Sequence, residues 1–310
     1  MLGAQVTSGW RCVVRSHYCR WLAAVVVIAG TVITAQAQTT EESGLFFSGR
    51  FSGSSNSAGT VLKADPALGY RFNSHFETYA GVPFYFVNES STTTTATGTT
   101  TSATSNGFMN GIGNAYLGFR LGLDNPGVNF ASNLVATAPT GDKDKGFSTG
   151  RATVDWTNGF NHSFSALTPF ADVGLANTVS DTAFFVRPFS SLGLVTHFDG
   201  GARVALSQKV NVGGSAYAVR GVGQQTIISK LVRKASTAAA ATTGKGTNTQ
   251  VFRTSSQTVG SADLANDSGF SGWLSLLPQT GIDLQIGYTR SVGYDLDTLF
   301  FGVGFRFGKQ

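Results

Sequence analysis

The predicted fold rests on the stretch Leu299-Phe300-Phe301-Gly302-Val303-Gly304-Phe305-Arg306-Phe307, close to the end of the chain. Its odd-numbered positions are all large and apolar, whereas its even-numbered positions are Phe300, Gly302, Gly304 and Arg306. Successive side chains of a β-strand point to opposite faces, so this stretch presents one hydrophobic face and one mixed face. A strand with one face in hydrocarbon and the other toward a wetter interior is typical of a transmembrane β-barrel.

The same alternation recurs along the chain in about twelve segments, each near or above the roughly 9 to 11 residues that a tilted strand needs to cross a bilayer. In one of them, Leu68 and Tyr70 alternate with Gly69 and Arg71. In another, a single phase continues across Asp199-Gly200-Gly201, which favours one long strand over a hairpin. The predicted strands cover residues 44–53, 60–72, 76–87, 110–123, 128–138, 149–158, 163–176, 187–206, 210–221, 267–277, 281–291 and 297–307.

The connections between these strands alternate in length. Every second one is short, as at Asp124-Asn125-Pro126-Gly127, and most of the others are long, as at 88–109, 177–186 and 222–266. Short periplasmic turns that alternate with longer outer loops are typical of transmembrane barrels. The chain is therefore predicted to be all-β, a transmembrane antiparallel up-and-down β-barrel of about 12 strands.

The start of the chain predicts export. Arg11, Arg15 and Arg20 precede an apolar run over residues 21–33, and the small residues of Ala35-Gln36-Ala37 follow it. An apolar run of this length is too short for a transmembrane helix, which needs about 20 residues. We expect a signal peptide at 1–37 that is cleaved near Ala37, followed by an outer-membrane barrel at 38–310.

Composition excludes several other classes of protein. Only 13% of the residues are charged, whereas soluble domains average about 25%. Loss of residues 1–37 removes three arginines and lowers the basic residues from 22 to 19 against 17 acidic ones, a net charge of about +2. A nucleic-acid partner is therefore not expected. Both cysteines, Cys12 and Cys19, leave with the same segment, so neither a disulfide nor a cysteine metal site is expected.

The strand phase places one set of charged side chains on the inward face. Turning such groups toward lipid would cost about 2 to 4 kcal/mol for each Arg or Lys at mid-membrane. Their common phase therefore indicates which face is the lumen. These charged side chains are either the lining of a solute route or a ladder of ion pairs that fills a narrow barrel, since positive and negative residues are mixed. The candidate lumen-lining residues are Arg50, Arg71, Glu77, Arg120, Arg151, Asp155, His197, Asp199, Arg203, Asp283 and Arg306, with Lys63 and Asp65 in the same phase.

No enzyme, metal site or cofactor is expected from the motifs. His197 points inward with Asp199 two residues further on, a pattern that suits an ordinary lumen contact or a pH-sensitive pair. No strand carries a nucleophile beside a base at a characteristic spacing, and a lipid-acting enzyme would need a serine within reach of His197. Fragments such as Gly111-Ile112-Gly113 lack the third glycine and the following helix of a phosphate-binding loop.

Two stretches resemble a known family. The first is Leu134–Asp142, which ends a strand in Pro139-Thr140-Gly141 and is followed by Ser148-Thr149-Gly150; the second runs from Thr168 through Phe189–Phe198 to Tyr217. Both resemble the outer-membrane transporters of the meta-pathway of phenol degradation. The resemblance implies a barrel related to the long-chain fatty-acid transporters that passes hydrophobic or aromatic small molecules.

Together these observations predict a bacterial outer-membrane channel that passes a small, hydrophobic or aromatic solute passively. The alternative is a structural or surface-interaction barrel with an occluded lumen, because twelve strands lie between the filled eight-strand barrels and the open sixteen-strand ones. The expected partners are outer-membrane lipid, the solute, and the barrel-assembly machinery through the C-terminal strand. The oligomeric state is left open.

Overall fold

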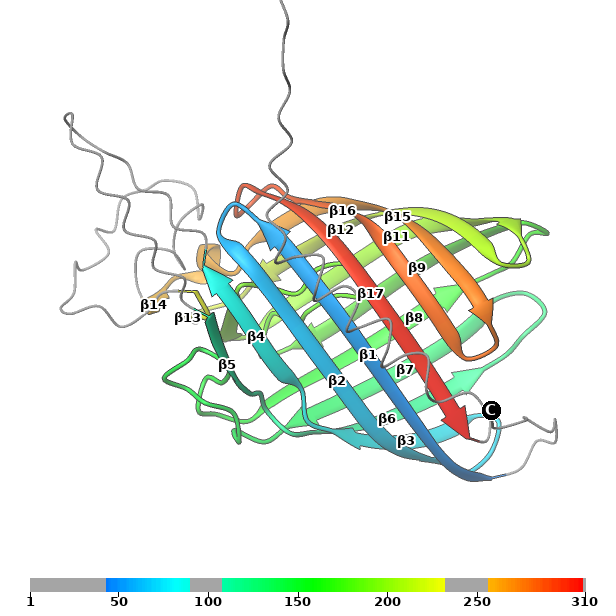
Figure 1. The fold of residues 1–310 in the computed structure, drawn as a ribbon, viewed down its shortest axis with the longest axis horizontal. Helices are drawn as coiled ribbons and strands as arrows, with labels where there is room; N and C mark the ends of the chain where they lie inside the picture. Colours follow the sequence, from blue (N-terminus) through cyan, green and yellow to red (C-terminus); the bar gives the residue numbers. More distant parts are fainter. Residues whose placement is uncertain (1–42, 90–107, 232–255, 309–310) are drawn as a thin grey trace, which may run out of the picture. The chain divides into compact units, whose positions relative to one another are not determined.

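The computed structural model describes residues 43–89, 108–231 and 256–308, which form a closed antiparallel β-barrel with almost no helix (Figure 1). The predicted signal peptide and the segments 90–107 and 232–255 lie outside the described residues. The barrel elements are β1 (Gly44–Asn56), β2 (Gly59–Arg71), β3 (Phe76–Gly81), β4 (Phe84–Glu89), β5 (Phe108–Ile112), β6 (Tyr116–Leu123), β7 (Asn129–Thr137), β8 (Thr153–Asn161), β9 (Leu167–Ala176), β11 (Val195–Ser207), β12 (Val210–Gly221), β15 (Asp267–Gln279), β16 (Ile282–Ser291) and β17 (Leu296–Gly308).

The barrel closes because β1 pairs with both β2 and β17. Two of the passages of the chain across the barrel wall are each split into two short strands. The first is split into β3 and β4, which both pair with β2, and the second into β5 and β6. On the other side, β3 pairs with β6 and β4 pairs with β5. Each broken pair makes one passage, so the predicted number of 12 strands and the all-β class are confirmed. The prediction of continuous strands at 76–87 and 110–123 is wrong. Pro83 lies in the first break, where its missing N–H removes a donor from the ladder.

A second, three-stranded sheet consists of β10 (Phe189–Leu192), β13 (Gln225–Ser229) and β14 (Gln257–Gly260). The predicted strand 187–206 is therefore wrong in its first part, because residues 187–194 lie outside the barrel wall. A bend at Gly193, whose φ of +148° is rare for residues with a side chain, separates β10 from β11. The predicted continuity across Asp199-Gly200-Gly201 is confirmed by the unshifted β9–β11 ladder.

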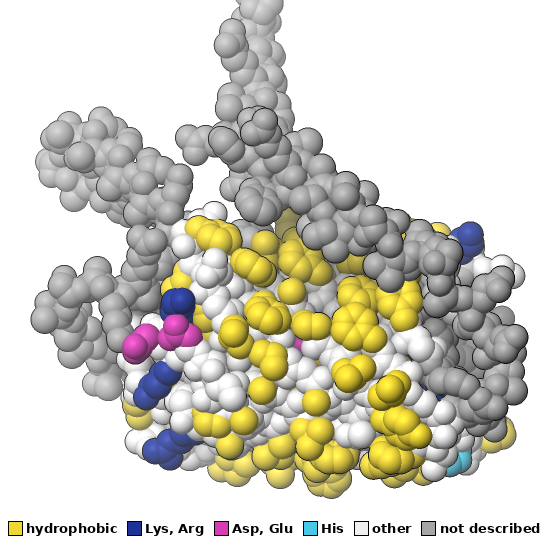
Figure 2. Space-filling view, turned by 60° about the horizontal axis from the view of Figure 1, so that its bottom comes forward, with side chains coloured by type: hydrophobic (Ala, Val, Ile, Leu, Met, Phe, Trp, Pro, Cys, Tyr) yellow, Lys and Arg dark blue, Asp and Glu magenta, His cyan; other side chains and the backbone are white. Residues whose placement is uncertain are grey.

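The two faces of the wall have the predicted chemistry. On β17, Leu299 and Phe301 point outward and are 67% and 37% exposed, whereas Phe300 points inward and is 3% exposed. Figure 2 shows hydrophobic side chains spread over the outer surface, with most of the visible charged groups toward the margins of the view. An outward belt of this kind suits a surrounding of hydrocarbon.

The outward belt gives a direct test of membrane insertion. Ile286, in the middle of β16, is 61% exposed, and we expect Ile286→Arg to destabilise the barrel by about 2 to 4 kcal/mol in a bilayer. The matched control is Val292→Arg, which changes an aliphatic residue that is 58% exposed in the turn after β16 and should cost less than about 1 kcal/mol. Urea unfolding in lipid vesicles measures both; equal effects would contradict a lipid-facing belt.

The barrel has two unlike ends. At the turn end, short connections follow β2, β6, β8, β11 and β15, and β1 begins and β17 ends there. At the loop end lie the longer connections 138–152 and 177–194, together with the described residues 222–231 and 256–266. The segment 177–194 is called the inward segment below, because its side chains and backbone contact the inner wall.

Candidate functional site in the barrel lumen

Four charged residues gather on the inner wall near the turn end. Arg71 and Glu77 are directly opposite on β2 and β3, and Glu77 and Arg120 on β3 and β6, so the strand register itself brings them together. The Glu77 carboxylate lies 3.2 Å from Arg71, 3.6 Å from Arg120 and 2.7 Å from Arg306, and its side chain is only 9% exposed. This arginine cluster consists of Arg71, Glu77, Arg120 and Arg306.

Acidic residues occupy a different part of the wall, on β8, β9 and β11. Asp155 contacts His197 at 3.1 Å and accepts hydrogen bonds from Ser180 and Thr157. Asp172 and Asp199 are opposite each other across the β9–β11 ladder. Strand order puts these three strands on the far side of the ring from β1 and β2. These three aspartates therefore lie apart from the arginine cluster, although Arg203 and His197 share their part of the wall.

His197 of β11 lies on the lumen side of the wall. Among the described residues its side chain contacts Asp155 and, at 3.5 Å, Thr157, whereas no serine hydrogen-bonds to it. No cluster of His, Cys, Asp or Glu in the described segments could hold a metal ion.

The other candidate residues differ in their positions. Arg50 lies 3.6 Å from Asp283 and donates a hydrogen bond to Gln285, and Arg203 lines a cavity together with Asp199. Arg151 does not lie in a strand, because β8 begins at Thr153 rather than at the predicted 149. It is exposed in the preceding connection.

The inward segment crosses the lumen and contacts several strands. Ser54 of β1 accepts a hydrogen bond from the Val186 N–H at 2.8 Å, and Thr289 of β16 donates one to the Phe184 carbonyl at 3.0 Å. Arg50 donates to the Ala183 carbonyl at 3.3 Å, and Ser180 reaches β8 through Asp155. These contacts lie around much of the barrel circumference, so the segment spans the interior and fills part of it.

The tip of this segment inserts an aromatic ring into an aromatic slot. Phe184 stacks on Trp273 of β15 with ring centroids 4.0 Å apart, and it lies 5.2 Å from Phe300 of β17. Trp273 and Phe300 can lie flat against the wall because they cover Gly213 and Gly287, where a Cβ atom would clash with their rings. The slot is therefore built by glycines on neighbouring strands.

A cluster of buried charged side chains holds the base of the inward segment in place. Arg187 is 3.3 Å from Asp267, and the two side chains are 1% and 0% exposed. Asp181 accepts a hydrogen bond from the Arg187 N–H at 2.9 Å and lies 3.3 Å from Lys63. Burial alone would raise the pKa of Asp181, but the charges of Lys230 and Lys63 and the Arg187 N–H hold it below its ordinary value.

Lys230, just after β13, joins the second sheet to this group. Its ammonium donates a hydrogen bond to the Arg187 carbonyl at 2.9 Å and lies 4.6 Å from the Tyr85 ring centroid. Burial lowers the pKa of Lys230 to about 8, although Asp181 acts in the opposite direction. The second sheet and the inward segment thus act as one cap, which packs with the wall into a hydrophobic core that includes Phe185, Phe189, Ile227 and Tyr294.

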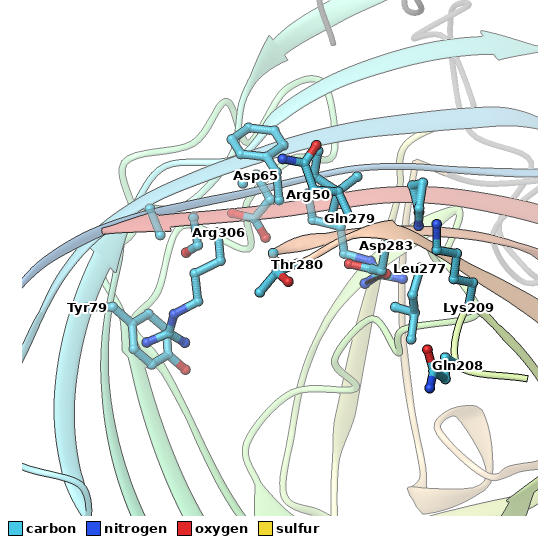
Figure 3. A pocket seen from close by; sticks show the side chains of 18 of the residues that line it. Arg50, Asp65, Tyr79, Gln208, Lys209, Leu277, Gln279, Thr280, Asp283 and Arg306 are labelled. Atoms are coloured by element: carbon cyan, nitrogen blue, oxygen red, sulfur yellow. Dashed lines mark ion pairs between the residues drawn. The ribbon is translucent and has the colours of Figure 1, made fainter. Parts of the chain in front are cut away.

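Three adjoining cavities lie in the lumen. The turn-end cavity, of about 890 Å³, is lined by Arg50, Asp65, Asp283 and Arg306 among others (Figure 3). The acidic cavity, of about 450 Å³, lies among Asp155, Asp172, Asp199 and the tip of the inward segment. The lysine cavity, of about 430 Å³, is lined by Lys63, Tyr85 and Lys230 among others. It shares Asp65, Tyr79 and Tyr116 with the first cavity, and six residues, among them Asp155, Thr157 and Ser180, with the second.

The sequence prediction missed the inward segment, Arg187 and Lys230. One signal was present: Phe184-Phe185-Val186 is a run of three apolar residues in a connection that was predicted to lie outside the barrel. Consecutive apolar side chains are unfavourable in an exposed loop. Such a run indicates a segment that packs against another part of the protein.

Comparison with known proteins supports the fold. No family model and no curated protein sequence matches this chain. Its structure resembles the COG4313 outer membrane channel from Pseudomonas putida F1, with a TM-score of 0.51 and 12% sequence identity over 88% of this chain and 97% of that one. The NanC porin follows with a TM-score of 0.43 and 9% identity over 85% of this chain and all of that one.

At these identities the likeness extends to the fold alone. The chain has the β-barrel fold of outer-membrane channels, and the resemblance to phenol-degradation transporters is not confirmed. No helix among the described residues is long and apolar enough to span a bilayer.

Proposed function

We propose that this chain is an outer-membrane channel through which a small solute crosses passively. The observation that carries the proposal is the set of three adjoining cavities, which extend from the turn end to the inward segment. Their walls carry fixed charges that would replace part of the hydration of a passing solute. We further propose that the chain reaches the outer membrane through a signal peptide at 1–37 and assembly at its C-terminal strand.

We propose that the solute has a hydrophobic or aromatic part. The slot between Trp273 and Phe300 supports this, because it already holds one aromatic ring, that of Phe184. Offset and tilted ring pairs are favourable at the centroid separations found here. A flat solute in the acidic cavity would lie beside this slot, since Trp273 and Phe184 line that cavity.

The inward segment makes opening a conformational step. Its tip is held by hydrogen bonds from Arg50 and Thr289 and by the ring stack on Trp273, whereas its base is held by the buried Arg187–Asp267 pair. We infer that a solute crosses the barrel when the tip leaves the slot. Loops that move in this way are found among the less stable parts of proteins.

The occluded structural barrel is the second candidate. It is favoured by the hydrophobic core at the loop end, where Phe185 and Ile227 are each 1% exposed. A core packed in this way resembles the interior of a soluble domain more than a pore. In this candidate the cap would stay in place permanently, and the loop-end surface would bind other molecules.

Liposome swelling separates the two candidates. Liposomes that contain the refolded protein are expected to admit polar solutes of the size of benzyl alcohol faster than empty liposomes do. The same protein is expected to give conductance steps in planar bilayers. The control is the same protein added after heat unfolding, which leaves lipid and detergent unchanged. A rate equal to that of empty liposomes would reject the channel and leave the structural barrel.

A further inference from the structure

The turn-end cavity has an excess of positive charge that its own carboxylates do not neutralise. Figure 3 shows Arg50 and Arg306 reaching into it from β1 and β17, which are neighbouring strands. Lys209, in the turn after β11, also lines it and has no carboxylate within ion-pair distance among the described residues. The cavity therefore has three cationic side chains on its wall.

Both carboxylates on the wall of this cavity already have cationic partners. Asp65 lies 3.2 Å from Lys63 and accepts a hydrogen bond from Tyr116 at 2.8 Å. Asp283 lies 3.6 Å from Arg50. Neither one approaches Arg306, whose carboxylate partner is Glu77.

Glu77 cannot neutralise its three arginines. One carboxylate carries one charge and accepts about four hydrogen bonds, whereas each guanidinium carries one charge and about five N–H donors. The arginine cluster thus keeps an excess of two positive charges. Arg120, with 49% of its side chain exposed, is bound only by the 3.6 Å contact to Glu77 among the described residues.

Two donors in this region are buried and have no acceptor. They are the Nε–H groups of Arg50 and Arg306, which find no hydrogen-bond partner in the described part of the chain. Arg306 is held in place from the other side, because its guanidinium lies 3.9 Å from the Phe46 ring centroid. Buried donors are almost always satisfied in folded proteins, so such a pair points to an acceptor supplied by a ligand.

We propose that the turn-end cavity is a binding site for a small organic anion whose carboxylate pairs with Arg306, while Arg50 and Lys209 elsewhere on the wall add positive charge. Charge-assisted hydrogen bonds to guanidinium groups suit a carboxylate, which offers two oxygens in the matching plane. Tyr79 and Tyr116, which line the same cavity, provide apolar ring surface for the rest of the molecule. This inference rests on the proposed channel function and adds that the solute carries a negative charge.

The opposite wall strengthens the assignment. The acidic cavity is lined by four carboxylates, those of Asp155, Asp172, Asp181 and Asp199, against two arginines, Arg187 and Arg203, so an anion that entered there would meet an excess of like charge. An anion is therefore expected to rest at the arginine side, near the turn end, rather than midway through the lumen.

Isothermal titration of the barrel in micelles tests the proposal without any need for transport. The probes are benzoate, benzyl alcohol and benzylamine, which share a ring and differ in charge, at about 0.1 M sodium chloride so that long-range attraction is screened. Benzoate is expected to bind at least about tenfold more tightly than either of the others. Equal affinity for benzoate and benzyl alcohol would overturn the site.

Variants locate the binding. Arg306→Gln should weaken benzoate binding by about tenfold or more, and Lys209→Gln, a change in an exposed turn that leaves the fold intact, by about twofold to fivefold. The matched control is Arg220→Gln, which alters an exposed arginine outside the three cavities and should leave the affinity unchanged. Unchanged binding in Lys209→Gln and Arg306→Gln alike would place the anion elsewhere and overturn the proposal.

The two proposals fail in different ways. Benzoate binding without any solute leak from liposomes would keep the anion site and reject the channel. A leak that comes with no preference for benzoate in the titration would keep the channel and reject the anion site.

Discussion

Replacing Arg187 with alanine is expected to destabilise the folded barrel by about 3 to 5 kcal/mol and to increase its conductance. The reason is that Arg187 is the ion-pair partner of Asp267 at a position where both side chains are almost fully buried. Removing one member of a buried ion pair leaves the other uncompensated, which costs far more than the pair itself contributes. Arg187 also donates a hydrogen bond through Nε to the Ser180 carbonyl at 3.0 Å, so its loss frees the base of the inward segment.

Arg290→Ala is the control for this prediction. Arg290 pairs with Asp295 and Asp297, which are 60% and 61% exposed, and exposed pairs contribute about 0 to 1 kcal/mol. Urea unfolding in micelles measures stability, and planar bilayers measure conductance. If Arg187→Ala lowered stability but left conductance at the wild-type value, the inward segment would not be the barrier to ion flow.

The barrel wall could be predicted because lipid imposes a strict rule on every strand. Phe301 and Phe300 differ by one position, yet the first points outward and the second inward, as the alternation requires. The same rule placed Glu77, Arg120 and Arg306 on the inner face before any register was known. Local periodicity was sufficient for these positions because the face to which each side chain points depends only on its place in its own strand.

The cap could not be predicted in the same way. The hydrogen bonds that hold the inward segment join residues far apart in sequence, such as Val186 with Ser54 and Phe184 with Thr289. The period of two in residues 187–206 predicted a strand, but β10 has that period as well and belongs to another sheet. Alternation therefore identifies strands and cannot say which sheet they join.

The grouping of the lumen charges needed the register. Both signs alternate along the sequence, which suggested local ion-pair ladders. Pairing of β3 with β2 and β6 forms such a ladder, in which Glu77 meets Arg71 and Arg120, while Asp172 and Asp199 meet across β9 and β11. The grouping of the charges is thus a property of strand pairing rather than of any single stretch of sequence.

Trp273→Ala is expected to have the second large effect, a loss of about 3 to 5 kcal/mol in stability together with a rise in conductance. The indole is 7% exposed and holds Phe184 by stacking at 4.0 Å, so its removal leaves a cavity and frees the tip of the inward segment. Large cavities left by aromatic-to-alanine changes in a packed interior cost energies of this size.

The comparison with Trp156→Ala isolates the role of the slot. Trp156 lies on the outer face of β8 and is 49% exposed, so its loss should leave the conductance unchanged. Phe184→Ala supplies a second test, because it empties the slot and keeps its walls, and it should raise conductance like Trp273→Ala at a smaller cost in stability. If neither Trp273→Ala nor Phe184→Ala changed the conductance, the ring stack would only stabilise the cap and another part of the cap would control passage.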